Sequence, residues 1–111
     1  TEWVLKGEVR MIDKIKKLKG LTLSTLAQNK KFTIEKVDES IVLVKLHETG
    51  GHRTIKMDEF ENGYKKLVLH GLLSLKELND DTLNSSYVIT ILSHFEGVIM
   101  RKNPIKLYVK G

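Results

Sequence analysis

The sequence predicts an α+β fold, and three observations lead to this fold class. Apolar residues recur at helical spacing near the N-terminus and again throughout the second half of the chain. Between these stretches, residues 31–57 have the alternation and β-branched composition of short strands. The 111 residues, 41% hydrophobic and 30% charged, have the composition of one globular domain. We therefore expect a single domain, 1–111, with one modest core.

A basic amphipathic helix is the first predicted element and occupies most of residues 1–20. Its apolar residues keep helical spacing over residues 8–19, and Gly20 is a natural end. Three cations share one exposed stripe of this helix: Arg10, Lys14 and Lys17.

Three antiparallel strands joined by two hairpins are the simplest prediction for residues 31–57. The strands are "KFTIEKV", "SIVLVKLH" and "HRTIKM", and the turns are "DES" and "ETGG". In the first strand the apolar series is expected to be Phe32, Ile34 and then Lys36. His47 and His52 flank the second turn near Glu48, a set that could bind zinc. Histidines on a solvated hairpin are the commoner case, so no metal site is predicted.

Three helices and a hairpin are predicted for residues 58–110. Asp58 is a plausible N-cap of the first helix, Ser74 and Glu77 form a capping box, and Ser85 or Ser86 caps the third helix. The elements are a helix over 58–70, a short helix over 74–79 that "NDDT" ends, a helix over 85–95, and strands 98–101 and 105–109.

This succession resembles the winged helix-turn-helix superfamily over residues 57–110, at the level of element order. The resemblance rests on "GLLSLKEL" after the first helix, "SSYVITILSHF" after the next turn, and the hairpin around "KNP". In winged-helix proteins the third helix commonly enters the major groove, and the wing contacts the backbone or minor groove. The resemblance implies nucleic-acid contact at two sets of residues: Ser86, Tyr87, Thr90, Ser93 and His94 on the helix, and Arg101, Lys102 and Asn103 on the wing.

Tyr108 is a separate candidate because strand alternation brings it to the polar face of the hairpin with Lys106 and Lys110. A tyrosine between lysines could stack on a base. The expected helix, by contrast, lacks the Arg, Lys and Gln side chains that read guanine and adenine. We therefore expect electrostatic and weakly sequence-specific binding, through the wing and the stripe of the N-terminal helix.

The charge distribution agrees with a polyanionic partner. The net charge is +5, and both ends of the chain are basic. Residues 1–31 hold eight Lys or Arg against three Asp or Glu, residues 32–97 hold seven against eleven, and residues 98–111 hold four against none. Segregated charge of this kind steers a polyanion toward some surfaces and away from others.

The predicted function is a non-catalytic nucleic-acid-binding module, either a small regulator or an accessory domain, with DNA ahead of RNA and a homodimer as a possibility. No motif indicates a nucleophile, a phosphate loop, a cofactor or a small-molecule substrate. Without cysteine, a long apolar run or a signal peptide, a cytoplasmic protein that does not cross a membrane is expected. The alternatives are a protein-interaction or self-association module, and an enzyme fragment whose chemistry lies elsewhere.

Overall fold

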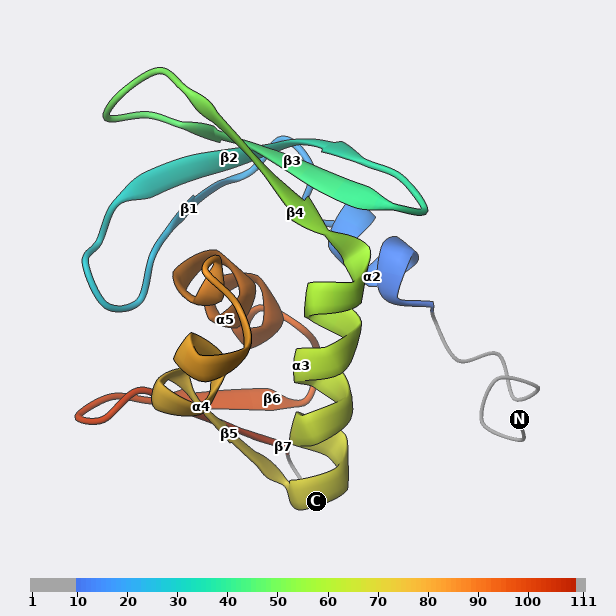
Figure 1. The fold of residues 1–111 in the computed structure, drawn as a ribbon, viewed down its shortest axis with the longest axis vertical. Helices are drawn as coiled ribbons and strands as arrows, with labels where there is room; N and C mark the ends of the chain where they lie inside the picture. The colour runs from blue at the N-terminus through green and yellow to red at the C-terminus, as the bar shows by residue number, and fades with distance from the viewer. Residues whose placement is uncertain (1–9, 110–111) are drawn as a thin grey trace.

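The computed structural model describes residues 10–109, which form two antiparallel sheets with helix α5 between them (Figure 1). The upper sheet has the strand order β1-β2-β3-β4, and the lower sheet has the order β5-β7-β6. The elements are α2 (Met11–Lys16), β1 (Thr22–Ser24), β2 (Lys31–Val37), β3 (Ile41–Leu46), β4 (His52–Lys56), α3 (Met57–His70), β5 (Leu72–Ser74), α4 (Leu75–Asp81), α5 (Ser85–Ser93), β6 (Val98–Arg101) and β7 (Lys106–Val109).

The upper sheet contains the three predicted strands and one more, so the three-stranded prediction was incomplete. The added strand, β1, pairs antiparallel with β2, and Leu23 lies opposite Phe32. Leu23 is buried while its neighbours Thr22 and Ser24 are exposed, which is the alternation of a half-buried strand. Three residues are too few for this alternation to be recognised in a sequence.

A bulge in β2 corrects the predicted apolar series of that strand. The register against β3 shifts between Ile34 and Lys36, so Glu35 and Lys36 are both exposed. Val37 then turns inward and is 8% exposed. A bulge adds one residue to one strand of a pair. Because of this bulge, the buried residue after Ile34 is Val37 rather than the predicted Lys36.

Helix α2 is shorter than predicted, because residues 17–20 form a turn rather than a continuation. Lys19 donates its backbone N–H to Lys16 O at 3.1 Å, and Gly20 has a φ of 86°. The Gly20 N–H then reaches Ile34 O at 2.8 Å, which ties the end of the helix to β2. Residues 8 and 9 of the predicted helix lie outside the described residues.

Helix α3 follows β4 directly and begins at Met57, one residue before the predicted cap. Lys56 occupies the N-cap position, so Asp58 lies in the first turn. Glu59 Oε2 accepts a hydrogen bond from the Lys56 backbone N–H at 2.9 Å, which satisfies one donor at the helix start. Gly71, with a φ of 74°, ends the helix as the sequence predicts.

The lower sheet contains a third strand, β5, that the sequence prediction lacked. Leu72, Leu73 and Ser74 pair antiparallel with β7, and the predicted hairpin of β6 and β7 is present beside it. Ser74 also caps α4, since its Oγ accepts from Glu77 N at 3.1 Å. Helix α4 runs through Asp81 rather than ending at 79.

The core lies between the sheets and around α5. Helix α5 ends at Ser93, two residues earlier than predicted, and Asn84 rather than a serine precedes it. It contacts α3, α4, β1 and β6, so it is enclosed by both halves of the chain. The fully buried large side chains come from both sheets and from α2, α3, α4 and α5: Phe32, Phe60, Ile15, Ile34, Ile55, Leu67, Leu73, Leu78, Ile89, Ile91, Leu92 and Leu107.

Candidate functional site

Helix α5, the predicted contact helix, is enclosed rather than presented to solvent. Six of its nine residues are buried: Ser85, Val88, Ile89, Thr90, Ile91 and Leu92. An amphipathic helix at the surface would bury only one stripe. The helix therefore offers no continuous polar face that could enter a groove of a duplex.

Thr90 and Tyr87 hold α5 to the upper sheet. Thr90 is 0% exposed, and its Oγ1 accepts from Leu26 N at 3.1 Å while donating to Ser86 O at 2.7 Å. The Tyr87 ring meets Phe32 edge-on at 5.1 Å between centroids. Both residues were predicted to contact nucleic acid. Thr90 is instead buried in the core, and Tyr87 is half-buried against Phe32 of β2.

The remaining α5 candidates offer little free surface. Ser86 is half-buried, and Ser93 uses its hydroxyl to donate to Thr90 O at 2.6 Å. His94 is exposed but stands alone at the end of the helix. The predicted site required these side chains to form one polar patch with Thr90, and they do not form it.

The cations of the N-terminal stripe are largely engaged within the protein. Arg10 makes two hydrogen bonds to the Glu39 carboxylate, at 2.7 and 2.6 Å, and this pairing raises the pKa of Arg10. Lys14 is half-buried, with its Nζ 2.9 Å from Tyr64 Oη and 4.4 Å from the centre of that ring. Lys17 alone of the three is exposed without a partner among the described residues.

The stripe and the hairpin tip lie at opposite ends of the molecule. In Figure 1, α2 lies at the right-hand edge, whereas the turn between β6 and β7 extends to the far left. The 13 predicted site residues therefore do not converge on one surface. Those of α2, α5 and the hairpin belong to three separate regions.

The hairpin and its sheet form the one group of candidates that stays together and faces solvent. Arg101, Lys102 and Asn103 are exposed at the tip, and Lys106 is half-buried on β7. Within the described residues, these three cations make no ion pair, unlike Arg10 or Lys66. Tyr108 is also half-buried on β7, next to Leu72 and Ile99 on the neighbouring strands.

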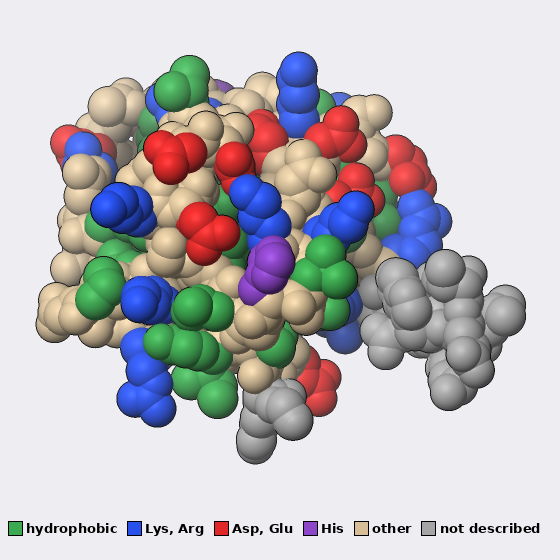
Figure 2. Space-filling view, turned by 60° about the horizontal axis from the view of Figure 1, so that its bottom comes forward, with side chains coloured by type: hydrophobic (Ala, Val, Ile, Leu, Met, Phe, Trp, Pro, Cys, Tyr) green, Lys and Arg blue, Asp and Glu red, His purple; other side chains and the backbone are tan. Residues whose placement is uncertain are grey.

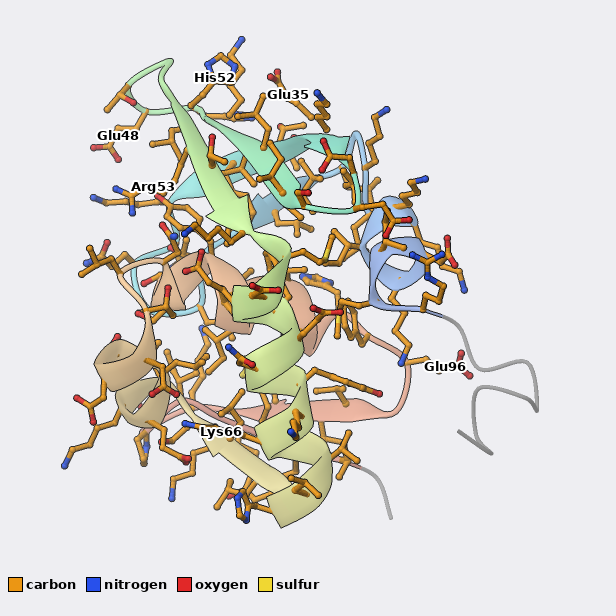
Figure 3. All side chains as sticks on the ribbon, turned by 45° about the vertical axis from the view of Figure 1, so that its right-hand side comes forward. Glu35, Glu48, His52, Arg53, Lys66 and Glu96 are labelled. Carbon is orange, nitrogen blue, oxygen red and sulfur yellow. The ribbon has the colours of Figure 1, made fainter. Side chains whose placement is uncertain are left out.

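The two histidines of the upper hairpin make separate contacts. His47 Nε2 lies 2.7 Å from Thr33 Oγ1, and His52 Nε2 lies 2.9 Å from Glu35 Oε1 (Figure 3). Among residues 10–109, no three His, Cys, Asp or Glu side chains are grouped closely enough to hold a metal ion.

A small hollow lies beside the upper sheet but is too small for a typical ligand. Its volume is about 80 Å³, and pockets for small molecules usually exceed about 300 Å³. It is lined by Lys30, Lys31, Leu46, Glu48, Thr49 and Tyr87.

Glu59 is a partly buried carboxylate whose contacts are structural. Partial burial would raise its pKa, but hydrogen bonds from Thr82, the Lys56 backbone and Asn84 together lower the pKa below its usual value. Asn84 in turn accepts from Arg53 Nη1 at 3.1 Å. The network joins β4, the start of α3 and the α4–α5 loop. No buried side-chain polar atom in this part of the described structure lacks a hydrogen-bond partner, as is usual for a structural network.

Sequence reasoning missed Leu72 and Ile99 as neighbours of Tyr108. Leu72 belongs to the unpredicted strand β5, and the alternation of Leu72, Leu73 and Ser74 is too short to stand out. Ile99 was assigned to a strand, but its facing relation to Tyr108 depends on register, which the structure supplies.

None of the helices in the described part of the chain is long and apolar enough to cross a membrane. Comparisons with protein-family models, curated proteins and solved structures found no match to this chain.

Proposed function

We propose that this protein is a non-catalytic nucleic-acid-binding module and that residues 57–109 form a winged-helix-like unit. The element order α3, β5, α4, α5, β6, β7, with β5 beside β7, supports the winged-helix likeness. Fold alone does not determine function, so the proposal depends on the surface.

The observation that carries the proposal is the charge of the lower sheet and its tip. Residues 72–74 and 98–109 include Arg101, Lys102 and Lys106 but no Asp or Glu. Free cations on an exposed hairpin attract phosphates, whereas a cation already paired with a carboxylate gains little from doing so. The hairpin is therefore the proposed contact surface, and α5 supports it from behind.

Binding of this kind is electrostatic and tolerant of sequence. Because α5 is enclosed, the helix that the winged-helix likeness would place in the major groove cannot bring its side chains against base edges there, where sequence is read most fully. Phosphate contacts position a protein on nucleic acid without specifying a sequence. We expect affinity to fall steeply as salt rises.

The test is fluorescence anisotropy with labelled duplex and single-stranded DNA, titrated with the protein between about 50 and 200 mM salt. Arg101→Glu with Lys102→Glu should weaken binding on the order of ten-fold or more, because each charge-assisted contact contributes more than about 1 kcal/mol. It should also reduce the salt slope by about one per cation lost.

The matched control is Lys16→Glu with Lys19→Glu, which makes the same change in net charge at exposed positions of α2 and the turn that follows it. This variant should bind almost as the wild type does. Equal loss in both variants would indicate attraction by net charge only, and no binding at low salt would refute the proposal.

A protein-interaction or self-association module is the second candidate, and exposed apolar side chains favour it. Leu83 is 95% exposed, Leu69 67% and Val68 52%. Sedimentation equilibrium over a range of protein concentrations tests this candidate. Dimerisation that Leu69→Ser with Val68→Ser abolishes, together with no binding to any oligonucleotide, would favour it over the nucleic-acid proposal.

A further inference from the structure

The outer face of the lower sheet has a row of apolar side chains that crosses all three of its strands. Register places Leu72 opposite Tyr108 on one side and Ile99 opposite Tyr108 on the other. Cross-strand neighbours of this kind have β-carbons about 4.5 to 5.5 Å apart, so the three side chains form one continuous surface. Tyr108, on the central strand, occupies its middle.

This row faces away from the core. The next row along the strands consists of Leu73, Leu107 and Met100, and Leu73 and Leu107 are both 0% exposed. Since successive side chains of a strand point to opposite faces, the Tyr108 row lies on the other side of the sheet. Ile99 is accordingly 41% exposed.

Cations adjoin the apolar row on the same face. Two residues along the strands, Lys106 lies opposite both Arg101 and Ser74, and Lys102 follows at the tip. The lower left of Figure 2, which shows this side of the molecule, has hydrophobic side chains together with Lys and Arg and no Asp or Glu among them. An aromatic centre and an adjoining cationic row are thus present on one acid-free surface.

From this surface we propose that the protein binds single-stranded nucleic acid in preference to duplex, with one base stacked on Tyr108 and adjacent phosphates held by Arg101, Lys102 and Lys106. The inference rests on the proposed function and specifies its ligand. Aromatic side chains beside a basic track are how many proteins hold single strands.

The chemistry of the surface distinguishes a single strand from a duplex. A duplex keeps its bases stacked on one another, so a tyrosine ring on a flat sheet cannot reach a base face. An unpaired strand can turn a base toward the sheet and so contact the ring and the neighbouring aliphatic side chains. The sheet is about 10 Å wide across three strands.

The decisive probe is a pair of labelled oligonucleotides with the same phosphates, one of oligothymidylate and one of the same length without bases. Anisotropy at low salt should show oligothymidylate binding several-fold more tightly than the abasic strand and than a duplex. The difference isolates base contact, because the electrostatic contribution of the two strands is matched.

Three variants identify Tyr108 as the residue responsible. Tyr108→Leu keeps an apolar side chain without a ring and should weaken binding to oligothymidylate by about five- to 150-fold, the range found for loss of one base–aromatic stack. Its affinity for the abasic strand should not change. Tyr108→Phe should retain the preference, and Tyr64→Phe, on helix α3, serves as a control for a tyrosine substitution elsewhere.

The outcomes separate this inference from the proposed function. Equal affinity for the two strands, or an unchanged preference in Tyr108→Leu, would overturn the stacking inference and leave electrostatic binding intact. Absence of binding to every probe would overturn both. A dimer that Tyr108→Leu converts to a monomer, with no preference for bases, would assign the apolar row to a second copy of the chain instead. Circular dichroism of each variant confirms that it is folded.

Discussion

Gly63 lies on the buried side of α3, at the place where α4 and α5 cross this helix. A β-carbon there would come within 3.3 Å of Leu92 Cδ1 and 3.4 Å of Leu78 Cδ2. The helix loses about 1 kcal/mol by having glycine rather than alanine in its interior. The close approach of three helices explains why this cost is tolerated: a side chain larger than a methyl group would push them apart.

Substitution of Gly63 measures that packing. Gly63→Val should lower the free energy of unfolding by about 1–3 kcal/mol, because it forces extra volume into a filled core. In Gly63→Ala the gain in helix propensity and the close contacts should roughly cancel. Urea denaturation gives both values. Asn62→Val, at the exposed neighbouring position, should cost only a few tenths of a kcal/mol, and an equal cost at 62 and 63 would contradict the packing explanation.

Glu59 gives the protein a pH dependence whose sign follows from its contacts. Its pKa is lowered from the usual 4.5 in the folded state, so the folded protein holds the charged form more strongly than the unfolded chain does. The resulting stabilisation is fully present above the unfolded pKa. It is lost as the pH falls through the lower folded pKa.

Glu59→Gln tests this sign because it keeps the shape and one acceptor oxygen but cannot ionise. The melting temperature of the wild type should exceed that of the variant near neutral pH, and the difference should shrink below about pH 4.5. Thermal unfolding followed by circular dichroism across the pH range provides the measurement. A difference that stays constant down to pH 3 would show that the charge of Glu59 does not contribute.

At the scale of elements, β5 and β7 determine the composition of the proposed contact surface. The hairpin β6–β7 alone would be a two-stranded ribbon, which is marginally stable in water. Strand β5 adds Leu72 and Leu73 to its two faces, so the hairpin becomes the edge of a sheet that packs on α3. The three strands together bring Leu72, Tyr108 and Ile99 into one row on the outer face of the sheet.

Helix α5 supports the fold from inside because elements pack against it on several sides. It contacts β1 on one side and β6 on the other, and it has buried residues around most of its circumference. In winged-helix proteins, which the proposed function invokes, the third helix commonly enters the major groove. In this protein the upper sheet covers it, so the hairpin sheet is the exposed alternative.

At the scale of the whole molecule, the upper sheet and the lower half share one core across α5. Thr90 joins them, since its Oγ1 accepts the backbone N–H of Leu26. No buried side-chain polar atom of the described residues lacks a partner, so the interface between the halves is fully satisfied. We expect the two halves to unfold in one cooperative transition.

Thr90→Val tests the coupling of the halves. The substitution preserves the shape of the side chain but leaves the Leu26 N–H without its acceptor, which should cost about 1–3 kcal/mol. The transition should remain single and move to lower denaturant concentration. Ser93→Ala, which removes a hydroxyl that only donates to a helical carbonyl, should cost less than about 0.5 kcal/mol. Two separated transitions in the wild type would contradict a shared core.

The sequence by itself determined the elements whose signals are local. The 14 residues of α3 have helical spacing and a terminal glycine, α4 has the Ser74 cap, and the strands β2, β3 and β4 are joined by short turns. The hairpin β6–β7 was predicted for the same reason, and so were the basic residues at its tip. Each of these depends on side chains a few positions apart, and the chain carries that information directly.

Tertiary structure decided the rest, because the deciding partners are distant in sequence. Strands β1 and β5, of three residues each, exist by pairing with β2 and β7 rather than through their own composition. Arg10 is paired with Glu39, 29 positions away, and Thr90 accepts a hydrogen bond from the backbone N–H of Leu26, 64 positions away. Whether a cation is free or a helix exposed depends on what packs against it. For that reason the hairpin is, of the three predicted contact regions, the one whose residues stay exposed as a group, and it is the proposed contact surface.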